Sequence, residues 1–400
     1  MTFALSIFFT LPAALILVVT LFLLAEVLAS LVAIRTGPAA VDRPSSIVVV
    51  IPAHNESVGM EPTIEDVLSQ LECSDRLIVV ADNCNDDTAS VARRLGAECI
   101  ERWDLEKRGK GYALQAALDS LEESEPSVVL FVDADCRLSA NFVSMVCSKA
   151  AFTGRPVQSM NLMKAAEDAP PQSRVSEFAW SFINDVRMRG LYRMFQITRL
   201  TGTGMALPWD IAKELEIGTG EIVEDLSLTI NLTRKGLAPM ILPEALATSG
   251  FPDSTDAAIQ QHARWEQGSI TFAWKHILPM FASGFRSNNG KLIAMAFDLA
   301  IPPLTVFGFL MISFLCLCSA ISLFGVLMPF YLMSTASVVF FVSLLIGWIL
   351  VGRSVLPPKY VGQILKYALD KRKVYGREAT DSTKTWTRTR RSDASPIRDD

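Results

Sequence analysis

The sequence predicts an α/β domain with a mostly parallel sheet, accompanied by transmembrane helices, one N-terminal and two C-terminal. Three observations indicate this. Half of the 400 residues are hydrophobic, and the mean hydropathy is +0.32, which is high for a soluble enzyme. Charged residues are almost absent from two long stretches near the ends, whereas the middle has the mixed charge of a soluble domain. Within that middle, short β-branched runs alternate with helical patterns.

The two charge-poor stretches predict three membrane crossings. Thr2 to Ile34 contains one ionisable residue, Glu26. This apolar run has no basic segment before it and is longer than a signal peptide needs, so we expect an uncleaved helix. The second stretch, between Asp298 and Arg353, contains no Asp, Glu, Lys or Arg. It far exceeds the roughly 20 apolar residues that cross a bilayer once, which suits two crossings joined by a tight turn.

Basic residues predict the orientation of the chain. Those that follow the first and last apolar stretches are Arg35, Arg43, Lys359, Lys366, Lys371, Arg372, Lys373 and Arg377. The positive-inside rule then places the soluble domain and the C-terminal tail in the cytosol of a multi-pass protein of the cell (inner) membrane. The expected order is an N-terminal helix, a cytosolic domain, interfacial amphipathic helices, a transmembrane hairpin and a basic tail, at residues 1–35, 42–255, 256–290, 291–353 and 354–400.

Composition argues against two other classes of protein. The net charge of −5 gives no indication of nucleic-acid binding. The seven cysteines show no metal-binding spacing, and three histidines make a histidine-built zinc site improbable.

The soluble domain is expected to contain four strands in a parallel sheet. Its strands are Ile47–Ile51, Leu77–Val80, Cys99–Ile100 and Val128–Val132, and its helices Glu61–Leu71, Asp87–Leu95 and Tyr112–Leu121. Ligands of such sheets bind at the carboxyl ends of the strands. Polar residues follow three of those ends: His54, Asn55, Glu56, Asp82, Asn83, Asp133 and Asp135.

Asp133 and Asp135 form an Asp-x-Asp motif directly after the fourth strand. Two carboxylates at one strand end repel each other, and a divalent cation relieves that repulsion while bridging to diphosphate oxygens. Two solvated aspartates in a turn are the alternative.

Two further motifs have a binding and a structural interpretation. Asp82 lies at a strand tip where a nucleotide would bind, whereas Asp86 can equally cap the next helix. Lys107 to Gly111 (KRGKG) opens a helix, where glycines, the helix N-terminus and Lys110 favour phosphate. A basic turn on its own is usually just solvated.

Two C-terminal motifs complete the candidate chemistry. Glu224 and Asp225 lie in an acidic, otherwise aliphatic stretch; a carboxylate there can take the proton of an attacking hydroxyl, and helix capping is the alternative. Helical spacing places Gln261, Arg264 and Trp265 on one face of an amphipathic segment. Arg can neutralise a diphosphate and an aromatic ring can stack on a sugar.

Seven sequence pieces resemble, in the same order, motifs of the membrane-bound family-2 glycosyltransferases, the branch that includes cellulose, hyaluronan and chitin-oligosaccharide synthases. They are IPAHNE, VVADNCNDDT, KGYAL, FVDAD, TGTGMA, VEDLSL and QHARW, over about residues 47–265. The resemblance implies a GT-A fold, inversion at the anomeric carbon, Mg²⁺ or Mn²⁺, and a nucleotide-diphospho-sugar donor, with a UDP-sugar expected. It also implies a glycan or lipid-linked acceptor, and makes other polysaccharide-assembly proteins candidate partners.

The same resemblance implies roles for individual residues. Glu56 and Asp82 would hold the nucleoside, Lys110 the phosphates, and Asp133 and Asp135 the metal and diphosphate. Asp225, next to Glu224, would be the catalytic base. The acceptor and diphosphate side would be formed by Gln261, Arg264, Trp265, Thr203 and Gly204.

Departures from the family pattern leave two functions open. Val223 stands where the family often has Thr, and Ala81 to Cys84 replace an Asp-Asp-Gly-Ser element. Three expected helices are fewer than polymer-extruding synthases usually carry. One hypothesis is a processive synthase in exopolysaccharide assembly, and the other is a single addition onto a polyprenyl-linked sugar or other lipid. A non-catalytic scaffold would have lost chemical residues that this chain retains.

Overall fold

The computed structural model describes residues 2–34, 42–219, 223–251 and 255–360, and for residues 2–5 and 255–265 the backbone alone. The described chain folds as two compact units. Unit 1 comprises residues 2–34, 174–195 and 270–360, and unit 2 comprises residues 42–173 and 196–269 without the two gaps. Arg35, Lys366, Lys371, Arg372, Lys373 and Arg377, which contribute to the expected orientation, lie outside the described residues.

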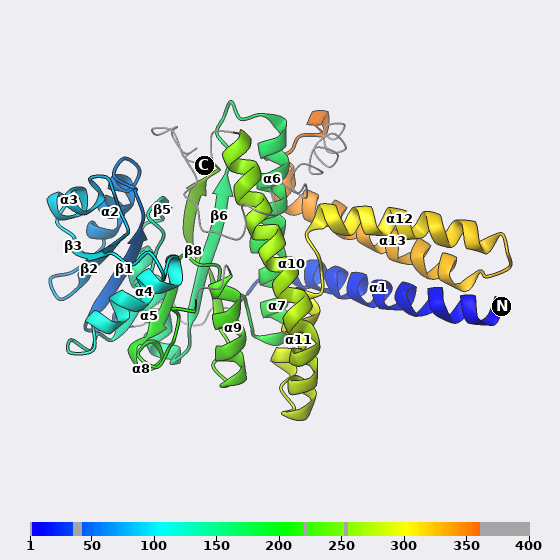
Figure 1. Ribbon diagram of the computed structural model, residues 1–400, viewed down its shortest axis with the longest axis horizontal. Helices are drawn as coiled ribbons and strands as arrows, with labels where there is room; N and C mark the ends of the chain where they lie inside the picture. Colours follow the sequence, from blue (N-terminus) through cyan, green and yellow to red (C-terminus); the bar gives the residue numbers. More distant parts are fainter. Residues whose placement is uncertain (1, 35–41, 220–222, 252–254, 361–400) are drawn as a thin grey trace. The chain divides into compact units, whose positions relative to one another are not determined.

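Unit 2 is built on an eight-stranded sheet, in the order β3-β2-β1-β4-β7-β6-β8-β5 among the described residues (Figure 1). The strands are β1 (Ile47–Ala53), β2 (Arg76–Asp82), β3 (Glu98–Arg102), β4 (Val128–Phe131), β5 (Cys136–Leu138), β6 (Val157–Lys164), β7 (Met205–Pro208) and β8 (Met240–Gly250). The pairs β1–β2, β1–β4, β2–β3 and β6–β8 are parallel, whereas β4–β7, β6–β7 and β5–β8 are antiparallel. The predicted α/β class with a mostly parallel sheet is confirmed.

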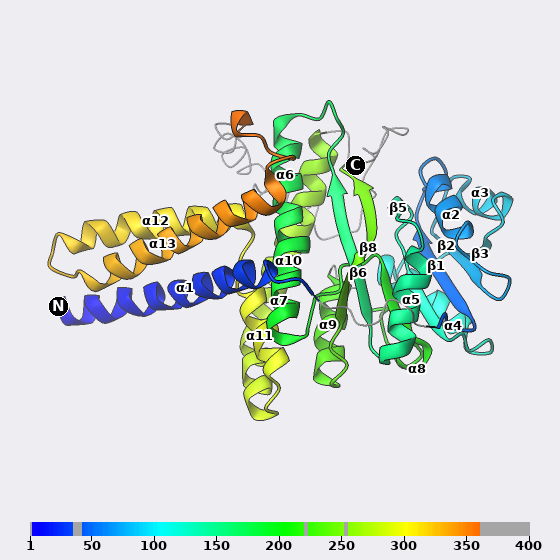
Figure 2. The same cartoon turned by 180° about the vertical axis from the view of Figure 1, so that it is seen from behind.

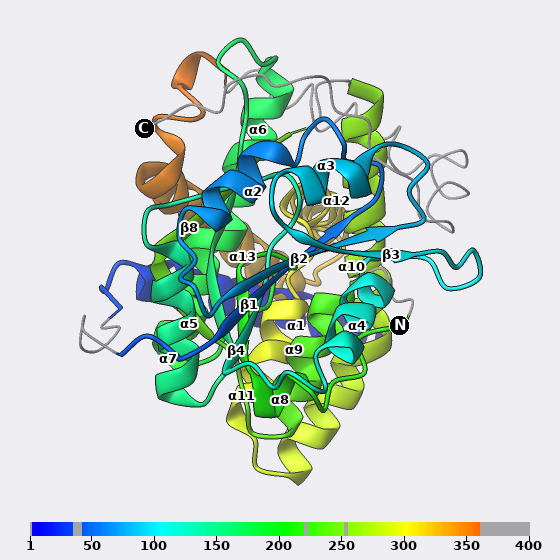
Figure 3. The same cartoon turned by 90° about the vertical axis from the view of Figure 1, so that its left-hand side faces the viewer.

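Helices cover both faces of this sheet (Figure 3). Successive residues of β1 point to opposite faces, so Val49 packs towards α2 (Glu61–Leu68), α3 (Thr88–Arg94) and α5 (Phe142–Thr153). Val50 packs towards α4 (Lys110–Ser120), α8 (Trp209–Ala212) and α9 (Glu224–Arg234). Burial on both faces explains why the strand is a continuous aliphatic run. Each fully buried Val contributes about 1.5–3 kcal/mol.

The register of the parallel strands creates the edge where the site lies. Ala53 pairs with Ala81, and Val50 pairs with Phe131. Because all three strands run in the same direction, the residues that end or follow them meet at one edge of the sheet. Asp82 ends β2, and Asp133 follows β4.

Unit 1 contains three helices that are long and apolar enough to cross a membrane, among the residues described. These spans are Ser6–Ser30, Leu304–Ser322 and Met328–Gly352, which confirms the expected number and placement of the apolar helices. They lie in α1 (Thr2–Ser30), α12 (Leu304–Ser322) and α13 (Met328–Gly347), which continues into the π-helical turn η2 (Trp348–Gly352). Helix α13 packs against both α1 and α12 (Figure 2).

The remaining helices of unit 1 come from two parts of the sequence. Between β6 and β7 the chain forms α6 (Pro171–Ser181), the π-helical turn η1 (Phe182–Arg187) and α7 (Met188–Phe195). Before the last two spans it forms α10 (Thr255–Arg286), whose first part belongs to unit 2, and α11 (Gly290–Leu299). A 3₁₀ turn, η3 (Pro358–Tyr360), ends the described chain.

Residues 174–195 fall within the expected cytosolic domain, residues 42–255, but they fold with the apolar helices. Gly190 of α7 lies against α1, where an added Cβ would be 1.8 Å from the Glu26 carbonyl oxygen. Phe182 lies against Gly347 of α13, where an added Cβ would be 2.1 Å from Cε2 of the Phe182 ring. These close approaches are possible because neither glycine has a side chain. This segment, the helical insert 174–195, is therefore an integral part of unit 1.

Candidate active site

Lys110 lies at the centre of the candidate site. It begins α4, and its ammonium donates hydrogen bonds to the Asp133 carboxylate and, at 2.7 Å, to the Gly202 carbonyl oxygen. Burial alone would lower the Lys110 pKa, but Asp133, Glu224 and Asp225 outweigh burial and raise it above its ordinary value. Lys110 is therefore a fixed positive charge among three carboxylates.

Glu224 and Asp225 form the first turn of α9. Both keep part of their surface accessible while protein atoms surround them on most sides. Burial, followed by the charge of Asp225, raises the pKa of Glu224 to about 7. Burial also raises the Asp225 pKa above its ordinary value, although Lys110 opposes this. Glu224 can therefore hold and release a proton near neutral pH, and Asp225 has a pKa shifted in the same direction, which suits a general base.

A glycine-rich loop, residues 201–204, forms the wall beside Lys110. Gly202 has φ +81°, and a Cβ there would lie 2.9 Å from Lys110 Nζ and 3.7 Å from Asp225 Oδ2. Gly204 has φ +65°, and its Cβ would collide with Ser159 Oγ at 1.8 Å. The Thr203 hydroxyl accepts a hydrogen bond from the Asp133 backbone N–H at 3.0 Å. The predicted acceptor residues Thr203 and Gly204 thus lie directly beside Asp133.

Asp133 and Asp135 are both half-buried at the end of β4. Within the described ranges no group of three or more His, Cys, Asp or Glu side chains is placed to hold a metal ion. The two carboxylates are hard oxygen donors, which suits Mg²⁺ or Mn²⁺ when substrate phosphate oxygens and water complete the coordination. The residues present therefore fit a cation that arrives with a diphosphate.

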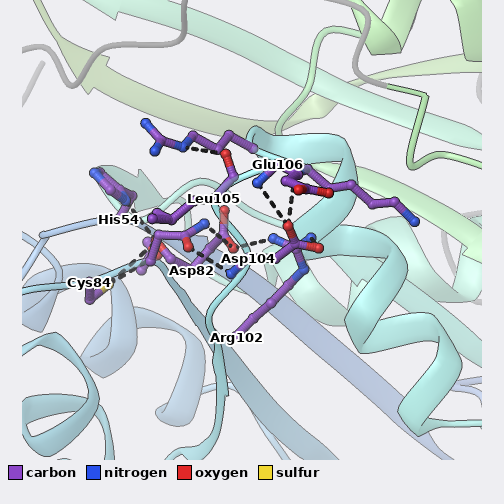
Figure 4. A network of polar contacts seen from close by, with 11 residues as sticks. His54, Asp82, Cys84, Arg102, Asp104, Leu105 and Glu106 are labelled. Carbon is purple, nitrogen blue, oxygen red and sulfur yellow. Dashed lines mark hydrogen bonds and ion pairs between the residues drawn. The ribbon is translucent and has the colours of Figure 1, made fainter.

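Asp82 lies in a polar network at the same sheet edge (Figure 4). Arg102 donates to its Oδ1 at 2.6 Å and, through its other nitrogen, to Asp104 Oδ2 at 3.2 Å. The Asp82 backbone oxygen lies 2.6 Å from His54 Nδ1. Asn83, with φ +51°, donates to Asp82 at 3.0 Å and accepts from the Asp104 N–H at 2.8 Å. Asp82 is therefore held rigidly, with a guanidinium at its side.

The other predicted residues fall into two groups. Glu56 lies in the turn after β1, where its N–H donates to Thr88 Oγ1 at 2.8 Å. Asp86 precedes Asp87, the N-cap residue of α3, and accepts from the Thr88 N–H at 3.0 Å and the Ser57 N–H at 3.2 Å, so its contacts in the structure are those of a turn. The backbone of Gln261, Arg264 and Trp265 is helical within α10, but their side chains lie outside what the structure describes.

Sequence reasoning missed two residues of this region. Arg102 pairs with an Asp twenty residues earlier, and an arginine at the end of an edge strand gives no local signal. Gln158 of β6 is fully buried and donates to the Thr203 carbonyl oxygen at 2.7 Å. No sequence signal pointed to it, because β6 mixes polar and apolar residues; the structure shows a buried amide, and a buried amide requires partners.

Comparisons with known proteins agree with this fold. The family described as "Glycosyltransferase like family 2" matches residues 44–268, more than half of the chain. The probable glycosyltransferase YdaM of Bacillus subtilis (strain 168) is 25% identical over 252 residues, which cover 58% of this chain and 57% of that protein. The matched region thus spans little more than half the length of this relative.

A solved structure is similar over almost the whole chain. It is the mannosyltransferase PcManGT from Pyrobaculum calidifontis in complex with GDP-Man and Mn²⁺, with a TM-score of 0.53. The match covers 96% of this chain and 98% of that one at 16% identity, so the likeness shows the fold alone.

The fold and the family match together define a GT-A-type glycosyltransferase domain. The chain belongs to glycosyltransferase family 2.

Proposed function

We propose that this protein is an inverting, metal-dependent glycosyltransferase that works at the cytosolic face of a membrane. It moves a sugar, of hexosyl or N-acetylhexosaminyl type, from a nucleotide-diphospho-sugar to a glycan or lipid-linked acceptor. The process that it serves is exopolysaccharide or cell-surface polysaccharide synthesis. The protein is assigned to the membrane-bound branch of the family, which includes cellulose, hyaluronan and chitin-oligosaccharide synthases.

The helical insert 174–195 carries this proposal. It lies in sequence between β6 and the glycine-rich loop, and it packs on α1 through Gly190 and Arg187. The loop that contains Thr203 and Gly204 therefore follows in sequence shortly after a segment that folds with the apolar helices. Such an arrangement suits an acceptor that is presented from a membrane.

The outer face of α10 supports membrane contact independently. Trp274, Leu278 and Phe285 are exposed and lie on one helical face because they are four and seven residues apart. Lys275 and Arg286 flank that face. Aromatic and aliphatic side chains bordered by basic ones are typical of a helix that lies in a lipid headgroup region.

The chemistry follows from the positions of the charged groups. Asp225 takes the proton of the acceptor hydroxyl as that oxygen attacks the anomeric carbon, so the sugar–phosphate bond breaks and the configuration inverts. Lys110 balances charge on the departing nucleoside diphosphate. A bound Mg²⁺ or Mn²⁺, held by Asp133 and Asp135, supplies further positive charge to that leaving group.

The Asp82–Arg102 pair suggests which nucleotides can bind. Uracil and guanine each present a ring N–H beside a carbonyl oxygen, which matches a carboxylate acceptor beside a guanidinium donor. Adenine presents the reverse pattern. We therefore retain UDP-sugars as the expected donors, with GDP-sugars as the second class to test, since PcManGT was solved with GDP-Man.

A single addition to a lipid-linked sugar is the alternative to processive synthesis. The observation that favours it is the small membrane part, with three candidate spans in the described residues. A polymer leaving through the bilayer needs a protein-lined path, and three helices provide little room for one.

Two linked measurements test the proposal. Purified full-length protein is incubated in lipid nanodiscs with Mn²⁺, a panel of UDP-, GDP- and ADP-sugars and a membrane-lipid extract, and release of nucleoside diphosphate is followed. We expect release with a UDP- or GDP-sugar and none with the Asp225→Asn variant. If none of the nucleotide sugars in the panel gives release, the proposal that the protein is a transferase is wrong. Sizing the labelled product then separates a polymer ladder from one discrete lipid-linked product.

A further inference from the structure

Gln158 makes side-chain contacts that its place near the start of a strand does not require. It lies on β6, fully buried, where its backbone pairs with Met205 of β7 and Ile241 of β8. Its side-chain amide bridges both ends of the glycine-rich loop. Nε2 donates to the Thr203 carbonyl oxygen at 2.7 Å, and Oε1 accepts from the Thr201 N–H at 2.9 Å.

The bridged loop in turn contacts the charged centre of the site. Between the two anchored residues lies Gly202, whose carbonyl oxygen accepts from Lys110 at 2.7 Å. The Thr203 hydroxyl accepts from the Asp133 backbone N–H at 3.0 Å. One neutral side chain therefore fixes the loop that positions both a cation and a candidate metal-binding carboxylate.

We propose that Gln158 is a positioning residue for transfer, acting through the glycine-rich loop to hold Lys110 at its place beside Asp133 and Asp225. The inference rests on the proposed function, and extends it to a residue that touches neither donor nor acceptor. The amide suits this role because it supplies a donor and an acceptor at a fixed separation while adding no charge among Lys110, Asp133, Glu224 and Asp225.

Without the bridge, Thr201 and Thr203 each lose a side-chain contact, and Asn161, which donates to the Thr201 carbonyl oxygen at 3.3 Å, holds one side of the loop alone. Gly202 has φ +81° and no side chain, so its peptide group can rotate once the amide no longer holds the residues on either side of it. Lys110 then loses a fixed acceptor and moves relative to Asp225. A displacement of about 1 Å at a reacting centre can lower turnover about 100-fold.

The test compares Gln158 with Gln70, a matched control in the same unit. Gln70 also bridges backbone groups, donating to the Ser139 carbonyl oxygen at 3.2 Å and accepting from the Val143 N–H at 3.1 Å. None of the site residues is among these contacts. The variants are Gln158→Met, which removes the amide, Gln158→Asn, which shortens it, and Gln70→Met, all in the full chain.

Turnover with the active nucleotide sugar is the first readout. Both Gln158 variants are expected to lower kcat about 10- to 100-fold. They also move the acidic limb of the kcat–pH profile to higher pH, because Lys110 no longer opposes protonation of Asp225 as strongly. Asp133 and Glu224 also face Asp225, and because Lys110 lowers the Glu224 pKa too, its displacement shifts both pKa values in the same direction. Gln70→Met is expected to lower the melting temperature alone.

Chemical labelling of Lys110 is the second readout and needs no transfer activity. Acetylation by acetic anhydride, quantified by mass spectrometry, is expected to be faster at Lys110 in both Gln158 variants and unchanged in Gln70→Met. If the Gln158 variants match Gln70→Met in labelling and in pH profile, the proposal is wrong. It is also wrong if both fail to fold while Gln70→Met folds, since Gln158 would then be purely structural. A wild-type protein inactive with every donor would instead contradict the proposed function.

Discussion

The Lys110 ammonium donates to the Asp133 carboxylate and to the Gly202 carbonyl oxygen, so a residue from α4 connects the end of β4 with the glycine-rich loop. The same ammonium also stabilises the charge of Asp225. A single positive charge thus links the candidate metal-binding acid, the acceptor-side loop and the candidate base. This connection makes Lys110 the position at which substitution discriminates best between a binding and a structural role.

Replacing Lys110 with Met should lower kcat/KM for the donor about 100- to 1,000-fold, as loss of a charge that balances a leaving group does elsewhere. The measurement is release of nucleoside diphosphate at several donor concentrations. Lys213→Met serves as the control, because Lys213 is half-exposed and pairs with Asp210 on the surface. Equal activity of the two variants would show that Lys110 has no part in transfer.

Asp225→Asn should lower kcat about 100- to 10,000-fold while the donor still binds, since the proton acceptor is lost and the shape is kept. In the wild type, burial raises the Asp225 pKa above its ordinary value. A base must be ionised, so activity is lost as pH falls through this raised pKa. The acidic limb of the kcat profile should therefore lie above about pH 4, the region for an ordinary aspartate. A limb at or below that pH would contradict the assignment.

Asp133→Asn and Asp135→Asn should each raise the Mn²⁺ concentration needed for half-maximal turnover, by about 100-fold or more, because each removes a charged oxygen donor. The measurement is a metal titration of chelator-treated protein. Asp119→Asn is the control, since Asp119 accepts a hydrogen bond only from Gln115 on the surface of α4. A titration curve unchanged in both test variants would exclude these carboxylates as metal ligands.

The parts of the fold that can be predicted from the sequence are those that leave a local pattern of residue types. β1 was predicted because Ile47 to Ile51 are aliphatic, and they are aliphatic because both faces of the strand are covered. Strands β6 and β8 were not predicted, since VQSMNLMK and MILPEALATSG mix polar and apolar residues without period. Two of the polar side chains of β6, Gln158 and Asn161, bond to a loop that is about 40 residues distant in sequence, at Thr201 and Thr203.

The helical insert shows a second limit of sequence patterns. Residues 174–195 contain Arg187, Arg189 and Asp185, so their composition resembles that of a soluble domain. Arg187 folds with unit 1 because its partners, Glu26 and Asp298, belong to that unit. These partners lie 161 and 111 residues away in the chain, so no local pattern reveals them. In the site, Lys110 can be predicted because it opens a predicted helix, and Asp133 because it comes directly after a predicted strand. No local signal points to Arg102.

The ion cluster of Glu26, Arg187 and Asp298 leads to a prediction about stability. Arg187 donates to Glu26 at 2.8 Å and to Asp298 at 2.6 Å, and all three side chains are at most 2% exposed. Arg187→Met leaves two buried carboxylates close together without a counter-charge. The expected loss of stability is about 3–5 kcal/mol, measured as thermal unfolding by tryptophan fluorescence in detergent micelles.

The triple variant Glu26→Gln, Arg187→Met, Asp298→Asn separates the charge effect from the packing effect. It keeps the side-chain volumes similar and removes every formal charge, so no uncompensated carboxylate remains. We expect it to recover most of the stability lost in Arg187→Met, because a buried ion pair contributes little net stability against a neutral substitute. If the triple variant is instead no more stable than Arg187→Met, the lost stability comes from the missing hydrogen bonds of Arg187 rather than from uncompensated charge. One of these hydrogen bonds runs from Arg187 Nη2 to the Asp298 carbonyl oxygen at 2.9 Å. That carbonyl oxygen is present in both variants, and a methionine side chain cannot donate a hydrogen bond to it.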